Sequence, residues 1–294
     1  MTAQTQTLAD AARPDARQVD AALAFCSAHD FPLGVALIAH RWRDGAADDV
    51  VAALARYQNA DGGFGNGLEV DIAATESNPF ATRLAMQALL ALRDRPDAAN
   101  AMLGGIDRYL TSAQDDGGDF RFSDAVKAGS LAPWFAGWTY PNLNPAACLA
   151  GLASRLGIGQ PPMFARVDAM VESIGDPEEL RTGGFYEILP YAEYAPLLAQ
   201  NGHAELLETT VEGITAQLQA GAYEDASHAL DHALGGGPVI AERIPEPLLS
   251  REATRLLGEQ QDDGGWPSPY NPAWRPWTTA TAFVHLATLR DMSR

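Results

Sequence analysis

The chain has 294 residues, of which 47% are hydrophobic, a proportion that is normal for a globular protein with a buried core. Its 38 acidic residues outnumber its 20 basic ones, and the net charge of −18 disfavours nucleic acids and anionic membranes as partners. Only one basic residue is a lysine, Lys127, so Schiff-base chemistry would depend on it, and no G-x-x-x-x-G-K-[ST] phosphate loop occurs.

The chain also lacks the usual signals of export. Its N-terminal segment has neither the charged start nor the apolar run of a signal peptide, and no apolar run approaches the length of a membrane span. Cys26 and Cys148 lie far apart in apolar stretches without a C-x-x-C spacing, and we interpret both as buried free thiols. We therefore expect a soluble, cytoplasmic protein.

Apolar residues recur at helical spacing along most of the chain, whereas no segment alternates convincingly as a strand does. Residues 1–15 are expected to form a disordered or frayed tail, which leaves 16–294 as a single domain. The stretch 121–142 is the longest irregular one, and loops of this length are usually functional or ordered by packing. The predicted helices cover 17–28, a segment that opens at Pro32, 48–57, 80–92, 98–113, 144–156, 164–174, 191–200, 204–218, 224–234, 250–260 with Ser250 as N-cap, and 278–289.

One turn motif interrupts this helical pattern three times. It has the form Q-x-x-x-G-x-[FW] with a Gly-Gly pair inside, and it begins at Gln58, Gln114 and Gln260. The glutamine amide can bond backbone groups of two helices, the glycines permit unusual backbone angles, and the aromatic ring can bury the turn. We predict that the motif is a structural clasp, with a weaker fourth copy at 183–186.

Helical hairpins joined by a recurrent turn stack in series, either as an open solenoid or as a closed ring. The aromatic-rich loops that follow the turns favour closure, because a ring would bring them together at one mouth. The predicted fold class is therefore all-α, an α/α toroid.

The clasp motif resembles the QW motif of squalene-hopene and oxidosqualene cyclases, and the inner-helix pattern from Thr279 to Leu286 is similar too. Together they place the chain, by resemblance, in the terpenoid cyclase/protein prenyltransferase α/α-toroid superfamily. The stretch from Gly62 to Asp71 also resembles that of a group of uncharacterised bacterial members, and that match implies no activity. The chain has no D-x-D-D motif, and neither cysteine has the context of the prenyltransferase zinc ligands, so we expect neither a metal nor another cofactor.

Three carboxylates follow the first clasp: Glu69, Asp71 and Glu76. In a toroid they would lie at the rim of the cavity, where mutual repulsion and apolar surroundings raise the proton affinity of a carboxyl, as a general acid requires. The alternative is that Glu69 or Asp71 caps a helix or pairs with an arginine such as Arg83. The spacing leaves both open for Asp71 and favours the structural role for Glu76.

Aromatic residues supply the second half of the predicted site. Their faces would bind an apolar substrate and stabilise a passing carbocation. Core packing is the better explanation for any single one of them, but a weaker one for the whole set, because they cluster in loops after turns. The predicted substrate-binding residues are Trp134, Trp138, Tyr140, Tyr186, Tyr191, Trp274 and Trp277.

Two metal-like patterns are interpreted as false signals. His228 and His232 lie one helical turn apart, with Glu224 as the only plausible third ligand. No H-E-x-x-H motif accompanies them, so we interpret them as a pair on the protein surface. The D-D-x-x-D spacing of 115–119 falls on a clasp.

Three functions remain open. The first is a terpene-cyclase-like enzyme that starts a cyclisation, isomerisation or hydration of a small apolar or isoprenoid substrate by protonating it, with Asp71 or Glu69 as the acid. The second is a non-catalytic protein that binds such a ligand. The third is a toroid hydrolase or lyase for a polar, sugar-like substrate.

Overall fold

The structure is a computed structural model and describes residues 7–293. Within these residues every regular element is a helix, and extended pairing is limited to three isolated bridges, one of which joins Ile72 to Leu131. The prediction of an all-α protein is confirmed. The chain divides into two compact units, unit 1 from 1–46 with 211–294 and unit 2 from 47–210.

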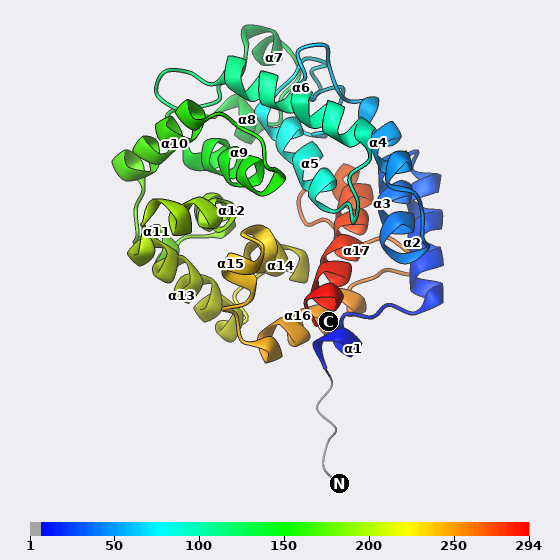
Figure 1. Ribbon diagram of the computed structural model, residues 1–294. Coiled ribbons are helices and arrows are strands. Elements are labelled where there is room, and N and C mark those ends of the chain that lie inside the picture. The colour runs from blue at the N-terminus through cyan, green and yellow to red at the C-terminus, as the bar shows by residue number, and fades with distance from the viewer. Residues whose placement is uncertain (1–6, 294) are drawn as a thin grey trace. The chain divides into compact units, whose positions relative to one another are not determined.

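Unit 2 is built around α5, α9 and α12, which are buried over most of their residues. In Figure 1, α9 packs between α5 and α12, and α10 packs on another side of α9. The amphipathic helix α6 buries only one face, which includes Met102, Ile106 and Leu110 at helical spacing. The helices of unit 2 are α4 (Ala47–Ala55), α5 (Pro79–Leu90), α6 (Asp97–Ala113), α7 (Asp124–Ala128), α8 (Pro133–Ala136), α9 (Leu143–Leu156), α10 (Pro161–Ile174), α11 (Glu179–Thr182), α12 (Phe185–Asn201) and the start of α13 (Ala204–Ala220).

Unit 1 joins the two ends of the chain. Its last helix, α17, packs against α3, α2, α14 and α16 (Figure 1). The indole Nε1 of Trp42 donates to the carbonyl of Phe283 at 2.9 Å, which fixes α3 on α17 across 241 positions of sequence. Its elements are α1 (Leu8–Ala11), α2 (Ala16–Ala28), α3 (Pro32–Trp42), the rest of α13, α14 (Ala226–Gly235), α15 (Pro238–Ala241), α16 (Glu246–Gly258), the 3₁₀ helix η1 (Pro272–Trp274) and α17 (Arg275–Met292).

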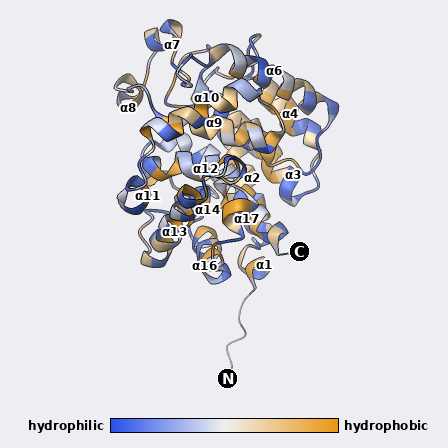
Figure 2. Ribbon diagram, turned by 60° about the vertical axis from the view of Figure 1, so that its left-hand side comes forward, coloured by the Kyte–Doolittle hydropathy of each residue, from blue (hydrophilic) through white to orange (hydrophobic). Residues whose placement is uncertain are grey.

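Most predicted helices form within a few residues of their expected ends. Figure 2 shows that helices such as α13 carry both hydrophilic and hydrophobic residues. Two predicted starts are wrong. Helix α16 begins at Glu246 rather than at a Ser250 cap, because Pro247 suits a first helical turn. Helix α12 begins at Phe185 and continues through Pro190, since buried Ile188, Leu189 and Tyr191 hold both sides of that proline in the core.

The expected tail over 1–15 falls partly on residues 1–6, which lie outside the described residues. From Leu8 the chain is ordered as α1, with buried Leu8 and Ala11 and a hydrogen bond from the Leu8 N–H to the Glu246 carboxylate at 3.2 Å. Among residues 7–293 no helix combines the length and apolar character needed to cross a membrane.

The three clasps share one hydrogen-bond pattern. Each glutamine Nε2 donates to the carbonyl of the glycine four residues on and to a backbone carbonyl of another helix. Gln58 reaches Met102 of α6 at 3.2 Å, Gln114 reaches Met163 of α10 at 3.2 Å, and Gln260 reaches Gln18 of α2 at 2.9 Å. The structural role predicted for the motif is confirmed, and the structure adds that each clasp fastens one helix to another.

Glycine is required inside the clasp because two backbones meet there. A Cβ on Gly264 would lie 2.4 Å from the Ala21 carbonyl oxygen, and this glycine has φ +88. The aromatic residue that ends the clasp is fully buried, and the Trp266 N–H donates to the Thr279 hydroxyl at 2.9 Å. The Phe64 N–H donates to the Thr82 hydroxyl in the same way, so a threonine of the next helix completes two of the clasps.

The fourth copy expected at 183–186 does not form a clasp. Gly183 and Gly184 have negative φ, and Gly184 is the N-cap of α12. Phe185 starts that helix and is only partly buried. The motif fails here because Glu179, which replaces the glutamine, begins the short helix α11 instead of ending a long one.

Candidate functional site

The candidate site lies in unit 2, where two loops pair beside α5. The Ala132 N–H donates to the Asp71 carbonyl at 2.9 Å, and the Ala73 N–H donates to the Ser130 carbonyl at 3.0 Å. This pairing joins the loop of predicted carboxylates to the aromatic stretch 121–142, so the two halves of the predicted site are neighbours in space.

An aromatic pocket of about 510 Å³ opens on this paired region. Its floor continues into a cluster in which Phe80 of α5 contacts three rings, with centroids 5.6 Å from Phe122, 4.6 Å from Phe135 and 5.0 Å from Trp138. Ile72, next to Asp71, packs in the same cluster. The residues that line the pocket are Phe122, Lys127, Gly129, Ser130, Leu131, Phe135, Ala136, Trp138 and Tyr140.

Tyr140 holds one wall of the pocket in place. Its hydroxyl accepts a hydrogen bond from the Phe122 N–H at 2.9 Å, and the Arg121 guanidinium lies over its ring at 5.0 Å. Burial raises the pKa of Tyr140, so the hydroxyl stays protonated at neutral pH. Arg121 itself is bound by the Asp115 carboxylate at 2.6 Å.

Glu69 is the carboxylate whose environment differs most from water. It is 5% exposed, and burial raises the pKa of its carboxyl to about 8; the negative charge of Asp71 adds to this rise. The Asp71 N–H donates to Glu69 Oε1 at 3.2 Å and Arg83 lies nearby, and both lower the pKa by smaller amounts. Glu69 is therefore mostly protonated at neutral pH, although it is not among the residues that line the pocket.

The other two predicted acids differ from Glu69 in their surroundings. Asp71 is partly exposed, and its main-chain atoms make the contacts to Glu69 and Ala132 described above. Glu76 is exposed, and its carboxylate lies 3.4 Å from the hydroxyl of Thr75.

A buried ion pair behind the site could not be anticipated from local sequence. Arg83 of α5 binds Glu193 of α12 through two hydrogen bonds of 2.8 and 2.6 Å, and the Gln87 amide donates to the same carboxylate at 2.9 Å. Burial raises the pKa of Cys148 on α9 well above its ordinary value, and the Glu193 charge raises it further. The structure thus gives Arg83 a buried carboxylate partner that lies 110 residues away in the sequence.

The predicted aromatic residues have different environments. Trp138 and Tyr140 line the pocket, whereas Trp134 and Tyr186 are 50% and 55% exposed. Tyr191 is buried, and its hydroxyl accepts from the Asp176 N–H at 2.8 Å, so it serves as a core residue of α12.

The remaining two predicted aromatics belong to unit 1. Trp277 is buried edge-on against Phe31, with ring centroids 6.2 Å apart, and Trp274 ends η1.

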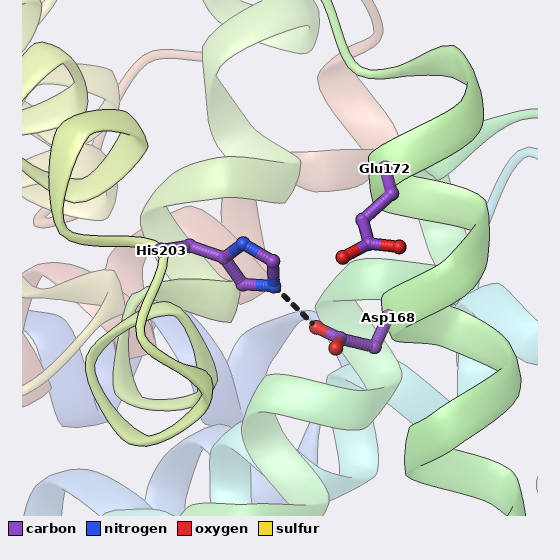
Figure 3. A group of neighbouring side chains, drawn as sticks. All are labelled: Asp168, Glu172 and His203. Atoms are coloured by element: carbon purple, nitrogen blue, oxygen red, sulfur yellow. Dashed lines mark hydrogen bonds and ion pairs between the residues drawn. The ribbon is translucent and has the colours of Figure 1, made fainter.

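One group of possible metal ligands lies elsewhere in unit 2. Asp168 and Glu172 of α10 and His203 after α12 place ligand atoms within 4.8 Å of one another (Figure 3). The Asp168 Oδ1 accepts hydrogen bonds from Tyr194 and Asn201 and lies 3.0 Å from His203 Nε2. Burial opposes ionisation of Asp168, but these hydrogen bonds together bring its pKa below the ordinary value. The contacts of Asn201 and His203 with Asp168 hold the loop after α12 against α10.

The two metal-like patterns in the sequence have other partners. His228 Nδ1 lies 3.0 Å from its N-cap Asp225, whereas His232 Nδ1 lies 2.9 Å from the Tyr223 hydroxyl. These separate partners account for one ring nitrogen of each histidine, and His232 is fully buried, so the predicted surface pair is wrong. In the second clasp, Asp115 accepts from the N–H groups of Gly117 and Asp119, as expected for a turn.

No family model matches the chain, and no curated protein matches its sequence significantly.

Proposed function

We propose that the protein binds a small apolar, isoprenoid-like molecule in the aromatic pocket of unit 2. The observation that carries the proposal is the pocket itself, about 510 Å³ with walls from Phe122, Phe135, Trp138 and Tyr140. Small-molecule sites are typically concave and a few hundred Å³ in volume, and polar and apolar groups share the wall of this pocket. Aromatic faces suit isoprenoid chains, whose branched apolar surface they cover.

Catalysis is the second candidate, and the state of Glu69 favours it. A carboxyl with a pKa of about 8 holds a proton at neutral pH and can donate it to an electron-rich double bond. In that step the carboxyl O–H bond breaks, a C–H bond forms, and the substrate becomes a carbocation. The carbocation then cyclises, loses a proton or takes up water, and the proton released returns to Glu69. This terpene-cyclase-like chemistry requires the reacting double bond to reach Glu69 past the paired loops.

The proposal also includes the α/α-toroid fold for the chain. Its support is that both units carry the same clasp, and that each clasp fastens one helix to another. Small-angle X-ray scattering, compared with curves calculated for closed and open arrangements of the two units, tests this part separately.

Binding is tested first with geraniol as the probe, by calorimetry and by mass spectrometry of molecules that co-purify. Leu131→Gln places an amide in the pocket wall and should weaken geraniol binding severalfold. The matched control is Ile174→Gln, an exposed apolar residue of α10 outside the pocket. Equal binding by both variants would contradict the pocket as the site.

Turnover then separates an enzyme from a carrier. The wild-type protein, Glu69→Gln and Asp71→Asn are incubated with geraniol and with farnesol, and products are identified by mass spectrometry. Loss of product in Glu69→Gln alone assigns the acid to Glu69, whereas loss in Asp71→Asn assigns it to Asp71. Ligand recovered unchanged from the wild-type protein supports the non-catalytic function.

A further inference from the structure

The aromatic pocket also has polar residues in its wall. Lys127, at the end of α7, and Ser130, in the loop that follows, both line it, whereas Phe122, Leu131 and Phe135 supply apolar surface. The only lysine of a chain with net charge −18 therefore lies in the wall of this pocket.

The ammonium of Lys127 is more available to a ligand than the guanidinium of the neighbouring Arg121. Its acidic neighbour, Asp124, is fully exposed, and the two charged atoms are 3.8 Å apart, so water weakens their attraction. Arg121, the other cation of this stretch, is engaged with Asp115 at 2.6 Å and lies over the Tyr140 ring. Lys127 thus offers positive charge to the pocket.

We propose that the pocket selects ligands with an apolar body and a carboxylate head, and that the head is bound by Lys127 and the Ser130 hydroxyl. This inference rests on the proposed binding function and names the class of ligand. The acidic chain repels anions at long range, so a local cation is needed to admit one. A carboxylate accepts hydrogen bonds from both an ammonium and a hydroxyl group.

The test compares geranate with geraniol, which share a carbon skeleton and differ in the head group. Calorimetry on the full-length wild-type protein should give an affinity for geranate about two to five times that for geraniol, the range expected for a half-exposed ion pair. Lys127→Met should abolish this preference, so that the ratio of the two affinities falls to about one. Lys127→Arg should retain it.

The matched control is Arg181→Met. Arg181 is 56% exposed with an i,i+3 acidic partner, and Lys127 is 53% exposed with a partner at the same spacing. The inference is overturned if geraniol binds as tightly as geranate, if Lys127→Met keeps the preference, or if Arg181→Met loses it equally; the pocket would still stand as a site. If neither probe binds, the proposed function fails together with the inference.

Discussion

The Glu69 carboxyl gives the molecule a stability that depends on pH in an unusual direction. Its pKa is about 8 in the folded chain against an ordinary 4.5, so between these values the folded state holds a proton that the unfolded state has lost. Stability must therefore fall as pH rises from about 4.5 to 8, by up to roughly 5 kcal/mol from this residue. Most acid groups in proteins act in the opposite sense.

We predict that Glu69→Gln removes this loss, because an amide cannot ionise. Urea unfolding at pH 5 and pH 8.5 should show the variant gaining stability relative to wild type by a few kcal/mol at the higher pH. Glu76→Gln, a change at an exposed carboxyl of the same loop, is the control. If the two variants respond alike to pH, burial of Glu69 has not raised its pKa.

At the scale of elements, the clasps hold helices together through close backbone approach. Gly118 and Gly202 both have positive φ, +97 and +85, so an added methyl group strains the backbone at either position. Only at Gly118 would the Cβ meet a neighbour, the Arg166 carbonyl of α10 at 2.6 Å, whereas Gly202 has open space. Comparing alanine variants at the two positions therefore separates the cost of the clash with α10 from the cost of local backbone strain.

Gly202→Ala should cost roughly 1–2 kcal/mol from the left-handed conformation alone. Gly118→Ala should cost more than this by at least about 1–3 kcal/mol, because the clash forces the clasp away from α10. Denaturant unfolding of both variants at one pH measures the difference. Equal losses of stability in the two variants would show that the clasp can shift to relieve the clash without weakening its contact with α10.

The buried ion pair between α5 and α12 has a different energetic role. Removing Arg83 leaves the Glu193 carboxylate without its two strongest donors in a buried position, which should cost about 3–5 kcal/mol. Replacing both with methionine removes the unpaired charge and should cost less than the two single changes added together. A double-mutant cycle by chemical denaturation checks this, and additive losses would mean that the pair is not coupled.

Local sequence predicts the clasps because all their internal contacts fall within eight residues, from Gln58 to Phe64 for example. Their external partners, such as Met163, depend on tertiary packing and leave no local signal. The short helices α7, α8, α11 and α15 escape prediction because four or five residues cannot show helical periodicity.

The candidate site divides in the same way. The carboxylate cluster and the aromatic stretch are visible in the sequence as local enrichments, and they meet through the backbone pairing of 71–73 with 130–132. The sequence does not reveal which carboxyl is buried, because burial depends on tertiary packing. Arg83 with Glu193 and Asp168 with His203 are pairs whose members are far apart in the chain, and one sequence provides no means of matching them.

At the scale of the whole molecule, the two units differ in how the chain builds them. Unit 2 is continuous, whereas unit 1 combines 1–46 with 211–294. The packing of α3 on α17 spans about 240 residues, while α5 and α9 pack across about 60. Each doubling of loop length costs about 0.6 kcal/mol of closure entropy, so the longer connection is disfavoured by roughly 1.2 kcal/mol, or about eightfold in rate.

We therefore predict that unit 2 folds first. In refolding followed by pulsed hydrogen exchange and mass spectrometry, amides of α5, α9 and α12 should gain protection several times faster than those of α3 and α17. Trp42→Phe removes the indole donor that links α3 to Phe283 of α17, and should slow only the later phase if that contact forms in its transition state. Simultaneous protection in the two units would mean that the closure of unit 1 does not limit its folding. Both units use the same clasp, so a difference in local structure does not explain a delay confined to unit 1. Such a delay would show that the distance in sequence between packed segments sets the order of folding.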